Sequence, residues 1–258
     1  MKLYHAALAA ALFPVPVLAI TNTNPAAPQR HLVYSFTYGV STDKQVHTSG
    51  MATQMTASGG NGTATGGSDG AASGMVDYTG GSSDKGTITV DVLHEQPDSG
   101  LVVTVSEQGQ DTRKADPTTC VVFSDTTLIC DPNKRVNAEE LTLLRFLGSH
   151  FVDPNNLDAK RHWHVERDGP ITTSSDYTIS KNDNGAMTID EVRIVKENSS
   201  KPQTTNINST IAYDFNKSVP TSINEYLIQR SEQGEDYNTI KSETTLSLVT
   251  DSMSTAKN

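Results

Sequence analysis

The sequence predicts an all-β protein, mainly antiparallel, in which long strands form a curved meander sheet, half-barrel or barrel-like, with one short amphipathic helix. Three observations carry this prediction. Apolar residues recur with period two along most of the chain, turn residues separate these runs at short intervals, and one segment alone shows the helical spacing of apolar residues. A β-sandwich of the same strands is the alternative.

The first half of the chain predicts one strand and then a hairpin. Residues 31–40 alternate large apolar with small or polar side chains, which is typical of a strand with one buried face. Residues 57–74 are too poor in large side chains to bury anything and predict a flexible Gly/Ser-rich loop or weak edge strands. Two further alternating runs, 86–93 and 100–107, flank a segment of turn residues and predict a β-hairpin.

Cys120 and Cys130 are the only cysteines in the chain. They lie at the outer ends of two β-prone runs that flank Ser124-Asp125-Thr126, so a tight hairpin would place their sulfurs on opposed residues. We expect a structural disulfide, because a redox or metal-binding pair would need C-x-x-C spacing or further soft ligands, which the sequence lacks.

The helix is predicted over residues 138–147, within NAEELTLLRFLG. Asn137 is placed as the N-cap, and Glu140 lies three residues on as its capping-box partner. If the sheet is a half-barrel, we expect the apolar face of this helix to lie against the concave side. Leu144 and Leu147 would then line a pocket, whereas in a sandwich the same leucines would be core.

The segment SKNDNGAMTIDE, residues 180–191, resembles an EF-hand loop in its spacing but predicts a hairpin. An EF-hand needs a carboxylate as its first ligand and a helix on each side, yet Ser180 stands first and both flanks are β-prone. Asn184-Gly185 favours a type I′ turn. In the strand that follows, the apolar parity changes near Asp190-Glu191, which predicts a β-bulge there.

His162, His164 and Glu166 fall on one side of a predicted strand. Two imidazoles and a carboxylate at alternate positions can reach one ion, so this trio is the candidate zinc site, although no fourth ligand lies nearby in the sequence. The alternative is an ordinary solvated strand face, with Trp163 and Val165 pointing inward, and no metal is expected.

No catalytic constellation or cofactor motif emerges from the sequence, so we expect no enzyme and no cofactor. Residues 66–70, GGSDG, match the nucleophile elbow G-x-S-x-G, but that elbow needs a strand-to-helix turn and the flanks supply neither. A formal net charge of -10 without a clustered basic face argues against nucleic acid as a partner.

The organisation predicted along the chain is that of one exported domain. Residues 1–19 have the charge, apolar run and cleavage site of a secretory signal peptide, and residues 20–30 predict an exposed leader. Residues 31–251 predict the single all-β domain, and residues 252–258 a disordered tail. No segment is apolar enough over about 18 residues for a transmembrane helix, so we expect a secreted or periplasmic protein.

The long strands, the meander order, the export signal and the lone amphipathic helix, roughly over residues 31–250, resemble the outer-membrane lipoprotein carrier proteins of the bacterial periplasm. The chain is equally similar in plan to secreted all-β bacterial proteins in general. The first resemblance implies a curved sheet that binds acyl chains, but it rests on no motif and implies no functional residue. Two hypotheses follow: a structural or surface-interaction domain, or a binding module for a lipid or other hydrophobic molecule.

Overall fold

The computed structural model describes most of the predicted domain. The described residues are 28–48, 74–96, 100–110, 116–123, 127–147, 152, 161–183, 185–197, 203–233 and 236–253. The predicted signal peptide, most of the leader, nearly all of the Gly/Ser-rich loop with its GGSDG motif, and the end of the tail lie outside these residues.

The described strands form one open antiparallel sheet of eleven strands in the order β5-β4-β3-β2-β1-β11-β10-β9-β8-β7-β6. This confirms the all-β meander prediction, and because there is one sheet, the sandwich alternative does not apply. The strands are β1 Arg30–Thr48, β2 Gly74–Gln96, β3 Gly100–Gly109, β4 Thr118–Phe123, β5 Leu128–Cys130, β6 His162–Arg167, β7 Ile171–Asp183, β8 Ala186–Glu197, β9 Gln203–Asp214, β10 Val219–Gln233 and β11 Asp236–Met253.

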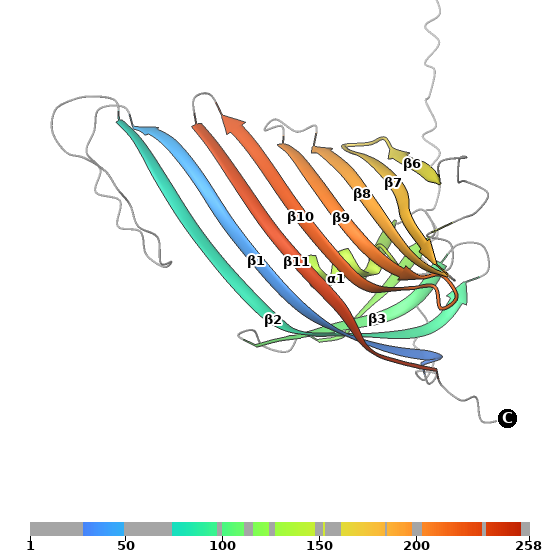
Figure 1. Cartoon of the computed structure of the whole chain (residues 1–258). Coiled ribbons are helices and arrows are strands. Elements are labelled where there is room, and N and C mark those ends of the chain that lie inside the picture. Colours follow the sequence, from blue (N-terminus) through green and yellow to red (C-terminus); the bar gives the residue numbers. More distant parts are fainter. Residues whose placement is uncertain are drawn as a thin grey trace, which may run out of the picture.

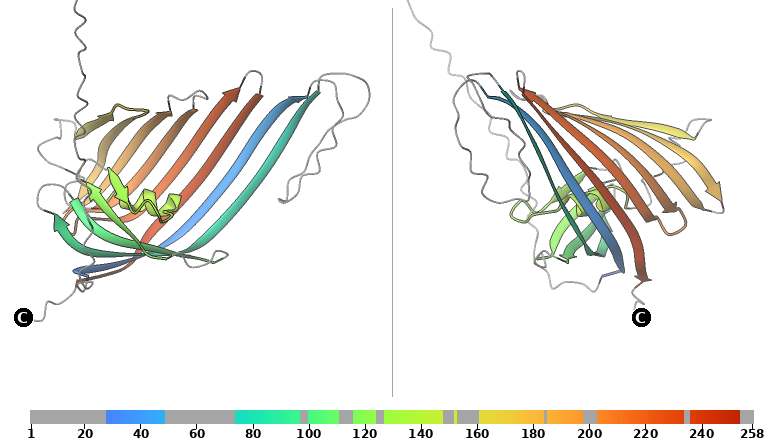
Figure 2. Two further views of the ribbon diagram at one scale, coloured as in Figure 1. Left: turned by 180° about the vertical axis from the view of Figure 1, so that it is seen from behind. Right: turned by 60° about the vertical axis from the view of Figure 1, so that its left-hand side comes forward.

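The sheet is strongly curved, and its concave side holds α1, Ala138–Leu144, the one α-helix among the described residues (Figures 1 and 2). The helix begins where it was predicted to begin. The Asn137 backbone N–H donates to Glu140 Oε2 at 2.8 Å, which is one half of the predicted capping box. Leu143 and Leu144 are fully buried, so the amphipathic segment covers the concave face.

The core lies between α1 and the inward-facing side chains of the strands. One row of apolar side chains crosses six strands in register and is almost completely buried: Ile179, Ile189, Ile211, Ile223, Leu246 and Phe36. Period-two alternation in each strand puts these residues on the same face, and the antiparallel register joins them. Burial of this row provides much of the hydrophobic stabilisation.

Several strands are longer than the sequence predicted. β1 begins at Arg30, inside the predicted leader, and β11 runs to Met253, inside the predicted tail. β2 begins at Gly74, although its first half has little apolar alternation. It pairs residue by residue with β1 from Gly74 to Val92, so the neighbouring strand holds this segment in the sheet.

The structure confirms the predicted hairpin of β7 and β8. Asp183 pairs with Ala186, and Gly185 has φ 89°, which a glycine adopts without strain. The predicted bulge at Asp190-Glu191 is wrong, because β8 keeps an unbroken register with β9 there. Glu191 instead points inward and is buried, with partners described below.

Candidate functional site

A cavity of about 250 Å³, called the end cavity here, lies where β1 begins and β11 ends. Its lining residues come from five strands and from the segments next to β1, α1 and β10: Gln29, Arg30, Leu32, Val92, Glu95, Leu101, Leu147, Lys217, Ser218, Val219 and Met253. Leu147, predicted to line a pocket, lies in this wall. Leu144 is fully buried in the core and is not one of the lining residues.

The apolar wall of the end cavity follows from the alternation of its strands. Leu32 of β1 and Val92 of β2 are buried inward-facing residues, and Leu101 of β3 is half-buried beside them. The register of β2 with β3 shifts between Val92 and His94, a bulge that bends the strand at this end of the sheet. Lys217, on the rim, is 60% exposed in its side chain.

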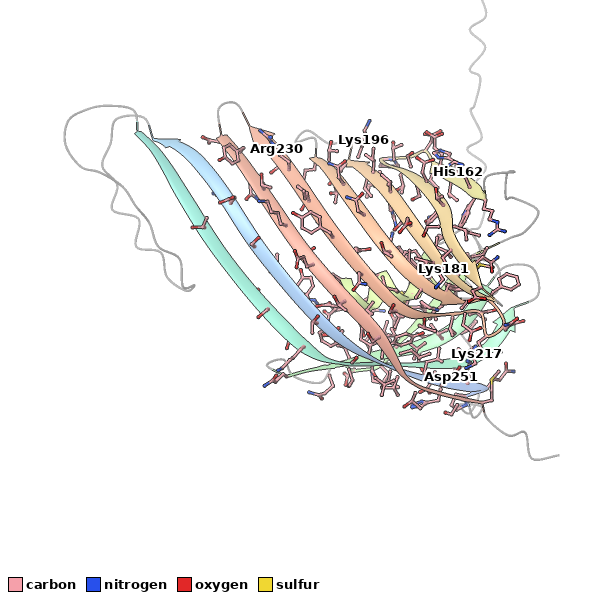
Figure 3. All side chains as sticks on the ribbon, viewed as in Figure 1. His162, Lys181, Lys196, Lys217, Arg230 and Asp251 are labelled. Atoms are coloured by element: carbon pink, nitrogen blue, oxygen red, sulfur yellow. A yellow bond between two sulfur atoms is a disulfide. The ribbon has the colours of Figure 1, made fainter. Side chains whose placement is uncertain are left out.

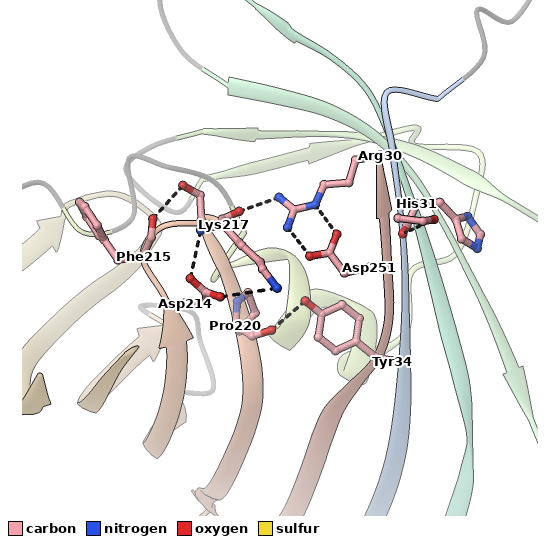
Figure 4. Close-up of polar contacts among 10 residues, drawn as sticks. Arg30, His31, Tyr34, Asp214, Phe215, Lys217, Pro220 and Asp251 are labelled. Atoms are coloured by element: carbon pink, nitrogen blue, oxygen red, sulfur yellow. Dashed lines mark hydrogen bonds and ion pairs between the residues drawn. The ribbon is translucent and has the colours of Figure 1, made fainter. Parts of the chain in front are cut away.

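An ion pair joins the two strands beside the end cavity (Figure 4). Arg30 Nε and Nη2 donate to the two carboxylate oxygens of Asp251, each at 2.8 Å, and Arg30 Nη1 donates to the Lys217 carbonyl at 2.6 Å. These hydrogen bonds from Arg30 lower the pKa of Asp251 below its ordinary value. The guanidinium is therefore held in place against the start of β10.

Tyr34 closes the same region from inside the sheet (Figure 4). Its ring is fully buried, and its hydroxyl donates to the Pro220 carbonyl at 2.9 Å. Burial raises the pKa of this phenol well above its ordinary value, so the ring stays neutral. The end cavity is thus lined mainly by apolar side chains, together with the charged residues Arg30, Glu95 and Lys217.

A second polar feature lies under α1 and is called the arginine clamp here: Arg145, Glu191 and Glu225. Arg145 Nη1 and Nη2 lie 3.3 and 3.4 Å from the carboxylate oxygens of Glu191, and Nη2 lies 2.5 Å from Glu225 Oε2. Thr142 donates its hydroxyl to Glu225 at 2.9 Å. Since Arg145 directly follows α1 and the glutamates lie on β8 and β10, the clamp fastens the helix to one wall of the sheet.

The clamp is built on a polar row that crosses the sheet next to the apolar row. Tyr177, Glu191, Ser209 and Glu225 are paired in register on β7, β8, β9 and β10. The hydroxyls of Tyr177 and Ser209 donate to Glu191 at 2.9 and 2.7 Å. Burial disfavours the charged form of Arg145, but the two glutamates outweigh burial and raise its pKa.

The candidate zinc residues lie on the edge strand β6, away from the end cavity. Their side chains are partly exposed, as expected for a solvated face, and Trp163 points inward and stacks on Tyr177 at 4.8 Å. His162 and His164 approach one carboxylate, Asp176, at 3.3 and 2.8 Å. Within the described part of the chain, no three His, Cys, Asp or Glu side chains are placed to hold a metal ion.

The predicted cysteine hairpin is confirmed. Cys120 on β4 is paired directly with Cys130 on β5, and their sulfurs lie at disulfide distance. Cys120 is fully buried and belongs to the hydrophobic core. The pair therefore joins the edge strand β5 to the rest of the sheet.

Sequence reasoning missed the residues that make the polar contacts. From the sequence, Arg145 has no assigned role in the predicted helix, and the change of apolar parity predicts a bulge at Asp190-Glu191. A signal was present, because an acidic residue at an inward position of an alternating strand predicts a buried partner of opposite charge. Arg30 and Asp251 could not be paired from sequence, because nothing local indicates that the first and last strands are neighbours.

Comparisons with known proteins add no relationship. No family model, no curated protein and no solved structure matches the chain. In the part of the chain that the structure describes, none of the helices has the length and apolar character needed to cross a membrane.

Proposed function

We propose that this protein is a non-catalytic binding module for a small hydrophobic molecule, and that the end cavity receives the apolar part of that molecule. The observation that carries the proposal is the end cavity itself, an apolar hollow inside a curved sheet that does not close. Ligand sites of small molecules are concave, mostly apolar, and carry a few polar groups that set orientation.

The size of the end cavity and the residues at its rim limit the class of ligand that would fit. Its volume, about 250 Å³, is slightly below the usual range for drug-sized ligands, so a short chain or the end of a longer chain is the best fit. Leu32, Val92, Leu101 and Val219 would contact this apolar part. A polar group of the ligand would stay at the mouth, where the exposed Lys217 lies.

A fluorescent fatty-acid probe tests the proposal. We expect saturable binding by the wild type and at least a tenfold loss of affinity in Leu147→Trp, because the larger side chain fills the cavity. The matched control is Leu141→Trp in α1, the helix that ends three residues before Leu147. Leu141 is 39% exposed, so this variant should bind like the wild type.

A probe that shows no saturable binding to the wild type contradicts the proposal. If Leu147→Trp does not fold, Leu101→Phe provides a second test, because Leu101 also lines the cavity but is only half-buried. Circular dichroism of each variant establishes that it is folded before binding is measured.

The second candidate function is that of a structural or surface-interaction domain. The tight core under α1 favours it, since Leu143, Leu144 and Phe146 are all fully buried and leave the centre of the concave face filled. We further propose that the protein is exported. The cysteine pair and the signal-like start of the sequence support secretion or a periplasmic location.

A further inference from the structure

Three buried glutamates, called the glutamate cluster here, meet at the start of α1, at the opposite end of the helix from Arg145. Glu139 and Glu140 belong to the first turn of the helix, and Glu107 projects from β3, against which the helix packs. Their exposed fractions are 6%, 2% and 5%. Three buried carboxyl groups that act on one another electrostatically are costly if all of them are ionised.

Glu107 has one buried carboxylate oxygen without a compensating contact. Glu140 accepts the Asn137 backbone N–H at 2.8 Å, whereas Glu107 Oε2 is buried without a hydrogen-bond partner. Burial, first of all, and then the charge of Glu139 raise the pKa of Glu107 to about 7. A hydrogen bond from the Asn137 side chain lowers it only in part.

The other groups around the glutamate cluster do not neutralise it. Asp84 of β2 adds negative charge beside Glu107 and Glu139. Tyr38 of β1 faces Glu139 as a neutral phenol, whose own pKa is raised by burial and by that glutamate. Arg135, just before the helix, is the one cation acting on Glu139, and its side chain is exposed.

We propose that the glutamate cluster is a pH-controlled latch. When protonated, it keeps the first turn of α1 docked on β3; when ionised, it releases that turn while the arginine clamp holds the other end of the helix. The helix spans the concave face between these two attachments. Its release opens one side of the half-barrel without unfolding the sheet. Any consequence for ligand release rests on the proposed function, whereas the latch itself does not.

The direction of the pH effect follows from the sign of the shift. A carboxyl group with a raised pKa in the folded state binds its proton more tightly there than in the released state. Docking is therefore fully favoured below pH 4.5 and weakens as the pH rises through about 7. For Glu107 alone, this linkage increases the opening equilibrium on the order of 50-fold between pH 5 and pH 8.

Hydrogen exchange of the full mature chain, measured without ligand and corrected for the intrinsic pH dependence, tests the latch. We expect amides of residues 137–144 to lose protection on the order of 50-fold from pH 5 to pH 8. Protection in β9 and β10 and the fluorescence of Trp163, which stacks on Tyr177 near the clamp, should stay constant. In Glu107→Gln, most of the pH dependence in α1 should disappear.

Glu243→Gln is the matched control, because Glu243 is exposed on the convex face and should leave the pH profile unchanged. If Glu107→Gln folds poorly, Glu139→Gln is the substitute variant. It should also reduce the loss of amide protection in α1 between pH 5 and pH 8. Equal protection of α1 at pH 5 and pH 8 in the wild type overturns the latch, as does an undiminished pH dependence in Glu107→Gln. Because no ligand is present, neither result depends on whether the end cavity binds one.

Discussion

At the scale of single residues, Arg145 has the greatest energetic consequence. It is the cation that Glu191 and Glu225 share, and the side chains of these glutamates are 0% and 8% exposed. A buried ion pair adds little net stability compared with apolar residues of the same shape, but removing one partner leaves the other charged and dry. The arginine clamp therefore fixes the position of the helix more than it stabilises the fold.

Arg145→Met should lower the free energy of unfolding by about 3 to 5 kcal/mol, because it leaves two buried carboxylates without their cation. Urea denaturation at pH 7 measures the change. The triple variant Arg145→Met/Glu191→Gln/Glu225→Gln should recover a large part of the loss. A control at the exposed Lys196, Lys196→Met, should change stability by less than about 0.5 kcal/mol.

The cysteine pair makes a second prediction at this scale. Since Cys120 and Cys130 are opposed across a hairpin, we expect them to be bonded in protein made in an oxidising compartment. A thiol reagent added to the unfolded, unreduced chain should label neither position. Labelling at both cysteines would show that the pair is reduced.

At the scale of elements, turns and registers decide which strands neighbour one another. Gly185 is the clearest case, since its positive φ belongs to the two-residue turn between β7 and β8. A Cβ at this position would collide with the side-chain amide of Asn216. The dihedral angle therefore favours glycine, and an added Cβ would require the exposed Asn216 side chain to turn aside.

Gly185→Ala should destabilise the protein by about 1 to 3 kcal/mol, because alanine is strained at φ 89° and its methyl group meets Asn216. Gly39→Ala is the contrasting variant, since a Cβ there meets nothing within 4 Å and the backbone is ordinary strand. It should be neutral or slightly stabilising. Thermal unfolding of both variants gives the comparison, and equal losses would contradict it.

The same elements show how far the sequence could predict the fold and the site. The hairpins at Asn184-Gly185 and Cys120/Cys130 and the start of α1 are set by local chemistry, so they could be read directly. The first half of β2 could not be predicted from the sequence, because its Gly and Ser residues form a strand only by pairing with β1. The buried contacts of Glu191 join segments distant in sequence, which no local pattern reveals.

At the scale of the whole molecule, the first and last strands are neighbours near the middle of the sheet. β1 pairs with β11 from Arg30, opposite Met253, to Gln45, opposite Tyr237. Figure 3 shows Asp251, the ion-pair partner of Arg30, at the same end of the molecule as Lys217. The described ends of the chain thus meet beside the end cavity.

A circular permutant should therefore keep the fold. A short linker would join residue 253 to residue 30, whose Cα atoms are paired across two strands and lie about 5 Å apart. The new ends would lie between Glu197 and Gln203, where the cut opens only the connection between two antiparallel strands. We expect an unchanged circular dichroism spectrum and a melting temperature within several degrees of the parent. New ends between Ile223 and Asn224, inside β10, should prevent folding.

The pairing of β1 with β11 also determines when the fold can be completed during synthesis. Until β11 has left the ribosome, β1 and β10 each keep one long edge of unpaired backbone groups, and no strand pairing joins the two halves of the sheet. Such edges bind holdase chaperones and start aggregation. A chain that ends before β11 should therefore behave as an aggregation-prone fragment.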